Sequence, residues 1–574
     1  MKARIDFPED GGRLRLAFSN PVEPLTAHRL DEVAAVIAEA ERQARAGRWA
    51  VGFVAYEAAP AFDAALKVRP PAGFLPLAAF AVYDAPFAAE IGDRPRFYES
   101  QNRGLSPISC CWRMETPRGR VLDAIAGIRR RIAEGDLYQV NLTTRLRAAF
   151  EGDGGALFEA LRESQPDGWC AHLEDGGWEV LSVSPELFFD WQGGTLTTRP
   201  MKGTASDAAS ATAMRESPKE QAENLMIVDL LRNDLSRIAK TGTVQVPQLF
   251  EVVRLPTAWQ MTSSVRCETR AGTGLADVFG ALFPCGSVTG APKVAAMAAI
   301  AELEDSPRGA YCGAIGLIRP GGHATFAVGI RTVVLDRSAG MAECGVGSGI
   351  VFDSHPEDEF DEWLVKRRFL LRATAGFDLI ETLRLEDGAY WLRDRHLARM
   401  EASAEYFGFP FDRMRIEGEL AAQCGRSGIF RVRLLLDRRG MPRTECFALE
   451  PAREEVIVAL AKAPVEGERE FLRHKTTERG AYGPFDPPEG VFDTLLWNAA
   501  GELTEFTRGN VVVEMDGRQV TPPLSCGPLP GVLRAEMLAR GEIAERVVKK
   551  DELPASTGLW FINSVRGRVK ARLV

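Results

Sequence analysis

The sequence predicts an α+β protein of two domains. Short apolar runs of strand length occur in neighbouring pairs, stretches with helical spacing lie between the pairs, and the pattern starts afresh near residue 375. Paired strands with helices between them are typical of large antiparallel sheets covered by helices. At roughly 100–200 residues per domain, the chain of 574 residues is long enough for more than one domain.

Composition narrows the class of function. The formal net charge is −9 and the sequence has no long basic stripe, so we expect no nucleic-acid partner. An acidic protein that binds an anionic substrate must therefore build a local cationic pocket. The N-terminal twelve residues lack the apolar core of a signal peptide, and no apolar run approaches the roughly 18 residues of a membrane span.

The cysteines indicate a reducing compartment. Ten cysteines are scattered along the chain, apart from the adjacent Cys110 and Cys111, and none has the spacing of a metal site. This pattern is typical of buried thiols in a reduced chain. We therefore expect a cytoplasmic protein.

The elements of the first domain follow from periodicity. Alternating or continuous apolar runs, bounded by Gly and Pro, predict strands at 14–18, 49–56, 77–83, 138–146, 178–183, 186–191, 313–318, 324–335 and 342–350. Apolar residues recurring every three or four positions predict helices at 26–46, 117–135, 215–239, 275–281, 292–303 and 357–374.

The second domain begins after the last of these helices. A strand at 379–385, a Glu-Asp-Gly turn, a strand at 390–392 and a helix at 394–407 follow one another there. We therefore expect two domains, comprising residues 1–374 and 375–574.

Lys202 is the most informative single residue. Pro200 restricts the backbone just before it, and Gly203 frees the backbone just after it. A lysine that is desolvated or close to other cations can act as a nucleophile. The alternative is a surface lysine in a turn.

Two segments carry pairs of glutamates with helical spacing. Glu220 and Glu223 form one pair, and Glu359 and Glu362 form the other. Like charges three residues apart repel on a helix, and Mg²⁺ would relieve that repulsion. Lys366 lies one turn beyond Glu362 and is suited to hold a substrate carboxylate. The alternative is that both pairs face solvent.

Two further motifs add to this pattern. The segment PCGSVTGAPK at 284–293 leads into an apolar helix, and its glycines and hydroxyls favour an anion-binding loop. The segment LRNDL at 231–235 is a polar cluster in an apolar helix, for which a solvent-facing helix end is the simpler interpretation.

Together these motifs resemble the chorismate-utilising enzymes, which include anthranilate, isochorismate, salicylate and aminodeoxychorismate synthases. The resemblance covers about residues 115–372, and GFVAYEAA at 52–59 fits the family's upstream part. It is carried by GDLYQVNLT (135–143), SPELF (184–188), KEQAENLMIVDLLRNDL (219–235), GSVTGAPK (286–293), YCGAIG (311–316), GIRT (329–332), GVGSGI (345–350) and the ExxExxxK at 359–366. It implies two large antiparallel sheets packed as a sandwich with flanking helices.

The resemblance also implies roles for individual residues. Glu223 and Glu362 would be the main Mg²⁺ ligands, with Glu220 and Glu359 supporting them, and Glu186 would transfer a proton near the ring. The remaining substrate-binding residues would be Gln139, Thr289, Gly290, Tyr311, Arg331, Gly347 and Lys366.

Two positions distinguish the subfamilies. Members that add water at C2 use a lysine where this chain has Gln139, and anthranilate synthases typically have alanine where it has Lys202. A lysine at that position marks the aminodeoxychorismate synthases, in which it attacks C2 and ammonia then replaces it at C4. One departure is Gln260, where the family commonly has a histidine. An anthranilate synthase remains the alternative, and ammonia would come from a separate glutamine amidotransferase subunit.

The second domain resembles fold-type IV pyridoxal-phosphate enzymes. The matching segments are FDLIET (377–382), RHLAR (395–399), RHKTT (473–477), LTEFTRGN (503–510), PGVLR (530–534) and FINS (561–564). By this resemblance Lys475 would carry the cofactor and Glu505 would pair with its pyridinium nitrogen. Arg399 and the backbone amides of Val532 and Leu533 would bind its phosphate, and Asn563 and Ser564 would add contacts.

The context of Lys475 beside a synthase domain favours aminodeoxychorismate lyase, which releases pyruvate and forms 4-aminobenzoate for folate biosynthesis. An amino acid aminotransferase and a non-catalytic interaction module are the alternatives. Because domains of this fold type usually dimerise, we also expect a homodimer through it.

Overall fold

The computed structural model describes the chain except residues 10, 88–111, 166–167, 206–207, 256–257, 375, 451–453 and 466–468. Cys110 and Cys111 therefore lie outside the described residues, and the other cysteines are free thiols. The chain divides into two compact units, Met1–Ala375 and Gly376–Val574. Within the described part, no helix is both long and apolar enough to cross a membrane.

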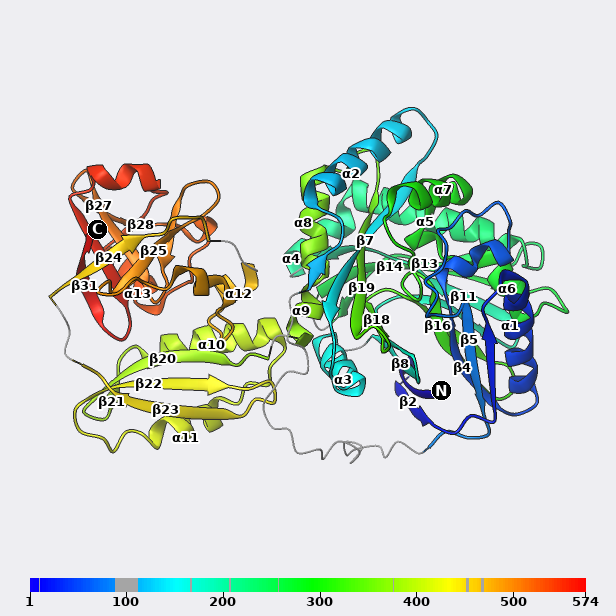
Figure 1. The fold of residues 1–574 in the computed structure, drawn as a ribbon, viewed down its shortest axis with the longest axis horizontal. Coiled ribbons are helices and arrows are strands. Elements are labelled where there is room, and N and C mark those ends of the chain that lie inside the picture. The colour runs from blue at the N-terminus through cyan, green and yellow to red at the C-terminus, as the bar shows by residue number, and fades with distance from the viewer. Residues whose placement is uncertain are drawn as a thin grey trace. The chain divides into compact units, whose positions relative to one another are not determined.

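Two antiparallel sheets form the centre of the first unit (Figure 1). The first sheet has the order β15 (Gly290–Ala291), β7 (Gln139–Ala149), β19 (Met341–Ile350), β18 (Thr332–Asp336), β9 (Trp178–Ser184), β8 (Trp169–Asp175), β1 (Lys2–Glu9) and β2 (Gly12–Phe18), with β6 (Arg113–Met114) beside β7. The second has the order β12 (Met201–Ala205), β14 (Ala258–Glu268), β11 (Thr195–Arg199), β10 (Leu187–Gln192), β17 (Ala324–Val328), β16 (Ala314–Ile318), β4 (Trp49–Val54), β5 (Ala78–Tyr83) and β3 (Glu23–Ala27), with β13 (Gln245–Leu255) beside β14.

The two sheets pack against each other, because alternate residues along each strand point to opposite faces of its sheet. Val51 and Phe53 of β4 point to a core that also contains Ile5 and Phe7 of β1, in the other sheet. The intervening residues of β4 point to a second core, between this sheet and helices. Strands buried on both faces are continuously apolar, as β4 and β5 are.

Helices cover the outer faces of the sheets. The core beneath α1 (Leu30–Arg45), α5 (Pro218–Ser236) and α6 (Leu275–Leu282) belongs to the second sheet, and Figure 1 shows α1 and α6 beside β4 and β5. The helices packed on the first sheet are α2 (Arg118–Ala133), α3 (Gly154–Ser164), α7 (Lys293–Leu303), α8 (Pro356–Lys366) and α9 (Arg368–Thr374). The short α4 (Ala208–Glu216) contacts β12 and α5.

The predicted strand at 324–335 is wrong in one respect. It is two strands, β17 and β18, which belong to different sheets. The chain changes sheets through 329–331, where Arg331 has a φ of 49°. Likewise, the predicted strand at 49–56 ends at Val54 and a 3₁₀ turn, Tyr56–Ala61, follows.

Two predicted helices are also interrupted. The segment 215–239 contains the end of α4 and then α5, which Ser217 caps and Pro218 begins. Serine at the cap and proline at the first position are strong start signals, so a new helix starts there. The segment 357–374 is divided between α8 and α9 at Arg367.

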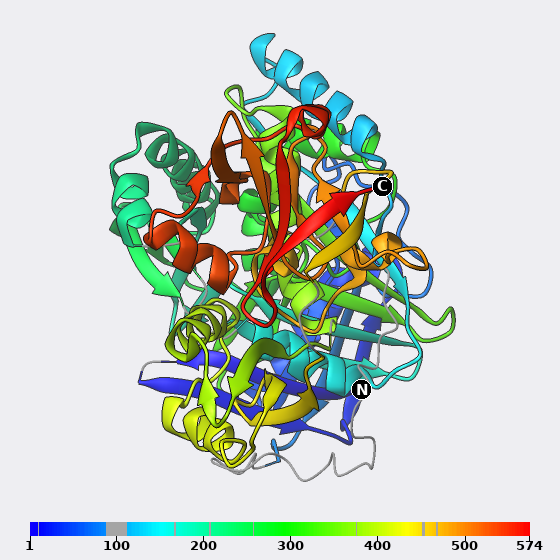
Figure 2. The same cartoon turned by 90° about the vertical axis from the view of Figure 1, so that its left-hand side faces the viewer.

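The second unit has two sheets of its own. One has the order β21 (Ala389–Tyr390), β20 (Leu379–Glu386), β22 (Ile429–Leu436) and β23 (Pro442–Ala448). The other has the order β26 (Leu503–Phe506), β25 (Asp493–Trp497), β24 (Glu455–Leu460), β31 (Gly567–Leu573), β30 (Gly558–Asn563), β27 (Asn510–Met515), β28 (Arg518–Thr521) and β29 (Ala544–Glu545). Figure 2 shows the C-terminal β30 and β31 in red.

The helices of the second unit are α10 (Arg393–Phe407), α11 (Arg413–Ala421), α12 (Arg469–Arg473) and α13 (Val532–Ala539). The predicted α+β class is confirmed.

Candidate active sites

The amine of Lys202 lies against the glycine-rich strand β19. A Cβ atom added to Gly349 would lie 3.0 Å from Lys202 Nζ and 2.7 Å from Gln139 Nε2, so glycine is what leaves room for both side chains. Lys202 comes from the edge strand β12, and Gln139 begins β7, which pairs with β19. The second sheet therefore supplies the lysine, and the first supplies the surface that it faces.

Two buried polar side chains beside Lys202 have atoms without hydrogen-bond partners. Both the nitrogen and the oxygen of the Gln139 amide lack one, as does Oε1 of Glu186. Burial raises the pKa of Glu186 to about 7, although Ser287 and the charge of Lys202 oppose the rise. Buried polar groups normally have partners, and exceptions with perturbed pKa values are typical of ligand sites.

The four predicted metal ligands lie near this lysine. Burial raises the pKa of Glu223, and the neighbouring charges of Glu220 and Glu359 act in the same direction. Burial would also raise the pKa of Glu362, but Lys366 and Lys202 outweigh it and hold the pKa below its usual value. Carboxylates that repel one another are suited to a hard divalent cation.

Mg²⁺ fits these residues by donor chemistry, although they are not arranged as ligands. Glu362 Oε1 lies 2.7 Å from Lys366 Nζ, and Glu359 accepts hydrogen bonds from Ser348 and Ser354. Within the described residues, no three acidic, histidine or cysteine side chains form a cluster able to hold a metal. Metal binding would involve movement of Glu362 away from Lys366 toward the ion, whereas Glu359 can keep the hydrogen bonds from its serines while it supports the ion.

The predicted carboxylate-binding residues come from two turns, a strand and a helix. Arg331 lies between β17 and β18, and burial lowers the pKa of its guanidinium to about 10. Lys366 Nζ donates to the carbonyl oxygen of Gly347 over 3.0 Å, and the Tyr311 ring packs on Gly345. A guanidinium that has lost part of its hydration gains from an anionic partner.

The loop at 284–292 is fixed to both neighbouring elements. Thr289 is buried, and its carbonyl oxygen accepts a hydrogen bond from the Asn141 amide of β7, while Gly290 pairs with Val140. Lys293, which follows the loop, forms a buried ion pair of 2.9 Å with Asp234 of α5. The polar LRNDL cluster is thus a partner of this loop, and the expectation of a solvent-facing helix end is wrong for Asp234.

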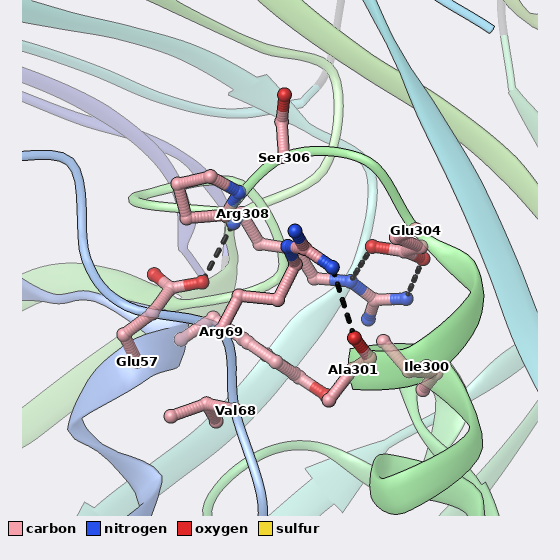
Figure 3. A pocket seen from close by; sticks show the side chains of 10 residues that line it. Glu57, Val68, Arg69, Ile300, Ala301, Glu304, Ser306 and Arg308 are labelled. Carbon is pink, nitrogen blue, oxygen red and sulfur yellow. Dashed lines mark hydrogen bonds and ion pairs between the residues drawn. The ribbon is translucent and has the colours of Figure 1, made fainter.

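A buried ion pair between Arg308 and Glu304 organises this region (Figure 3). The Arg308 guanidinium also donates to the carbonyl oxygens of Val288 and Asn141, each at 2.7 Å. Glu304 accepts from the amide and hydroxyl of Thr143. Glu57 accepts from the backbone amides of Arg308 and Gly309. The pair thereby joins β7, the loop and the turn after β4.

In the second unit, Lys475 and Glu505 influence each other. Burial lowers the pKa of Lys475 to about 8, with Arg399 acting in the same direction and Glu505 opposing it. Burial raises the pKa of Glu505 to about 7, and its carboxylate accepts hydrogen bonds from the Tyr482 hydroxyl and the Leu529 amide. A half-buried lysine of lowered pKa near a buried carboxylate fits pyridoxal phosphate, as does the partnerless buried hydroxyl of Thr504.

Two of the predicted phosphate-binding residues, Val532 and Leu533, begin α13, and Arg399 reaches that end of the helix from α10. Arg399 donates to the carbonyl oxygen of Pro530 over 3.0 Å, two residues before Val532 and Leu533 begin the helix. Ser564 is buried. The side chain of Asn563 is occupied by its own turn, since its oxygen accepts from the amides of Val565 and Arg566. Cationic side chains and helix N-termini together favour phosphate.

Two residues at these sites were not predicted from the sequence. Glu381 is fully buried and binds both Arg399 and His396, and these two partners hold its pKa at about 2 despite burial. Ser287 hydrogen-bonds Glu186. The signals were present, because Glu381 is an acidic residue in an apolar strand and Ser287 lies within the glycine-rich loop.

Comparisons with known proteins match the two units of the chain to two different families. Residues 10–372 match the family described as chorismate binding enzyme, and residues 378–574 match the family described as amino-transferase class IV. Anthranilate synthase component 1 of Methanothermobacter thermautotrophicus is 35% identical over 57% of this chain and 75% of its own length.

Aminodeoxychorismate synthase component 1 of Salmonella typhimurium is 38% identical over 44% of this chain and 57% of that relative, which is less than two thirds of its length. The crystal structure of anthranilate synthase component I from Streptococcus pneumoniae TIGR4 superposes with a TM-score of 0.52 at 26% identity, covering 64% of this chain and 89% of that chain.

Replacing Arg308 by Met should lower the free energy of unfolding of the first unit by about 3–5 kcal/mol, because it leaves Glu304 charged and buried. Arg232→Met removes an exposed partner of Asp229 and should cost less than about 1 kcal/mol. Urea denaturation followed by tryptophan fluorescence measures both. Equal losses of unfolding free energy in the two variants would show that the buried ion pair stabilises the unit no more than the exposed pair does.

Proposed function

The chain belongs to the chorismate binding enzyme family, and from this membership we propose that its first unit converts chorismate and ammonia into 4-amino-4-deoxychorismate. The observation that carries the proposal is the position of the Lys202 amine, which lies against Gly349 beside the partnerless amide of Gln139. Relatives named aminodeoxychorismate synthase component 1 give the proposal further support.

In the proposed reaction, Lys202 Nζ attacks C2 of the ring while the 4-hydroxyl departs. A hydroxyl is a poor leaving group, so it needs a proton, and Glu186 has a pKa of about 7 suited to donate one. Ammonia then adds at C4 and displaces the lysine. Covalent catalysis of this kind divides one difficult displacement into two easier steps.

The remaining residues of the site orient the substrate. Arg331, Tyr311 and Lys366 would hold its carboxylates, and the Gln139 amide would hydrogen-bond a ring substituent. Thr289 and Gly290 would form the wall of the pocket opposite Lys202. Glu220, Glu223, Glu359 and Glu362 would hold Mg²⁺, which supplies neutralisation of developing negative charge when bound.

The ammonia would come from a separate glutamine amidotransferase subunit. The support for this partner is the name "component 1" carried by the relatives, which implies a further component. A homodimer through the second unit and a cytoplasmic location stay predictions of the sequence.

Anthranilate synthesis is the second candidate for the first unit. It is favoured by the relatives of that name, including the Methanothermobacter thermautotrophicus protein. Against it is Lys202, which stands where anthranilate synthases resemble one another in having alanine. The two reactions differ in whether the amino group enters at C2 or C4.

For the second unit we propose removal of pyruvate from the product of the first, giving 4-aminobenzoate. Pyridoxal phosphate, when bound, supplies an electron sink for the carbon that loses a proton. Lys475, with a pKa of about 8, would remove the proton from C4, and Glu505 would hold the pyridinium proton. Arg399 and the start of α13 would bind the phosphate, with Ser564 and the backbone at Asn563.

Lys202→Ala should slow chorismate consumption roughly 10²-fold or more, since the nucleophile is lost. The assay supplies chorismate, ammonium, Mg²⁺ and pyridoxal phosphate to the full chain, and chromatography separates 4-aminobenzoate from anthranilate. Lys240→Ala, at an exposed lysine of the same unit, is the control and should leave the rate unchanged. Full activity of Lys202→Ala, or anthranilate as the wild-type product, would refute the proposal.

The amination rate should depend on pH through Glu186. Because the pKa of this carboxyl is raised to about 7, it carries the proton below that pH and loses it above, so kcat/KM should fall as pH rises through 7. The concentration of neutral ammonia must be held constant across the series. Glu186→Gln should lower the rate and abolish this fall, whereas Glu302→Gln, at an exposed position, should retain it. An unchanged profile in Glu186→Gln would exclude this role.

Lys475→Ala should bind no pyridoxal phosphate covalently and should accumulate 4-amino-4-deoxychorismate instead of 4-aminobenzoate. Lys462→Ala, at an exposed lysine of the same unit, is the matched control. Pyruvate release without an amino donor distinguishes a lyase from an aminotransferase. Pyruvate release from Lys475→Ala at the wild-type rate would show that this lysine has no part in the reaction.

A further inference from the structure

The first unit contains a second cavity, of about 300 Å³, on the same face of the sheet as the proposed reaction site. Its floor consists of three adjacent strands, with Arg145 and Arg147 on β7, Glu343 and Gly345 on β19, and Thr332 on β18. Residues of segment 70–75, which precedes β5, form the opposite wall.

Among the predicted site residues, only Tyr311 lines this cavity. A Cβ on Gly345 would lie 2.2 Å from the Tyr311 ring, so the ring rests directly on β19. The Arg145 guanidinium lies 5.0 Å from the ring centroid. Lys202, Glu186 and Gln139 do not line the cavity, and Gly349 lies four residues, roughly 13 Å, farther along the strand. The cavity is therefore a separate site.

The cavity carries an excess of positive charge. Arg145 is buried, with a relative exposure of 3%, and its guanidinium donates to the carbonyl oxygen of Pro307 and the hydroxyl of Thr143. No ion pair links it to a carboxylate within the described part of the chain. Arg147, in contrast, is paired with Glu115 and Glu343. The Arg145 guanidinium also donates to the Thr144 carbonyl oxygen, and its charge acts on Glu57 without forming an ion pair. A buried cation without a direct carboxylate partner favours an anionic ligand.

The wall opposite the arginines is apolar. Phe74 is half-buried and Leu75 is buried, and Pro70, Pro71 and Ala72 complete this side. Cavities of about 150 Å³ accommodate a benzene ring, so the volume suffices for one ring with a substituent. The single unpaired cation and the apolar wall thus match a ligand with one negative charge and a flat apolar body.

We propose that this cavity binds a small aromatic monocarboxylate, with the carboxylate on Arg145 and the ring between Phe74 and Leu75. The ligand would contact Tyr311 from the side away from Lys202, so its binding would be coupled to that of the substrate through this ring. The end product proposed above, 4-aminobenzoate, belongs to this class. Only that identification rests on the proposed function, because binding of the ligand class requires no turnover.

Calorimetric titration of the full chain with benzoate, in the presence of saturating chorismate and Mg²⁺ without ammonium, tests the proposal. Benzamide is the matched probe, since it has nearly the same shape and no charge. Benzoate should bind at least tenfold more tightly than benzamide. Equal affinities for the two probes, or loss of benzoate binding when chorismate saturates the chain, would overturn the proposal.

Ala72→Trp tests the location without changing the sheet. Ala72 lines the cavity, so the larger side chain should fill it and reduce the benzoate affinity at least tenfold. Ala65→Trp adds the same side chain at an exposed position outside the lining and should leave the affinity unchanged. Benzoate binding that survives Ala72→Trp would place the ligand elsewhere and refute the assignment.

Discussion

The ion pair between Arg308 and Glu304 is the interaction on which the first unit depends most. Both side chains are almost fully buried, and their closest approach is 2.5 Å. Such a pair is stable only when the remaining donors and acceptors are also satisfied. Here the backbone of β7 and Val288 satisfy them, so strand and loop must meet where the two charges lie. The proposed substrate pocket is built on that junction.

Near this ion pair lie side chains that have lost contact with water without gaining a hydrogen-bond or charge partner for every polar atom. Glu186 and Gln139 have polar atoms without partners, and Arg331 is half-buried with a lowered pKa. The second unit repeats the arrangement with Lys475 and Glu505. In both units, burial shifts pKa values toward neutrality, which is where acids and bases work best. The stability lost at these positions is offset by the satisfied networks around them.

Much of the fold and of the sites could be predicted from the sequence, for local reasons. Alternation along strands and cap signals at helices act within a few residues, so many elements of the first unit were predictable. In the second unit, only the elements that correspond to β20, β21 and α10 were predicted. The errors have a common cause. Nothing local shows that segment 324–335 changes sheets at Arg331, or that Asp234 turns inward to meet Lys293, because in each case the partner is distant in the chain.

The sequence by itself determined which chemical groups are present and their local order. Lys202 between proline and glycine, the two glutamate pairs and Lys475 in its motif are local facts. Only the tertiary structure decided which of them meet. Lys202 reaches Gly349 because two sheets pack face to face, and Glu381 meets Arg399 because a strand lies beside a helix. The buried cation of Arg145 was likewise invisible in the sequence, since burial and missing counter-charges depend on packing between segments far apart in the chain.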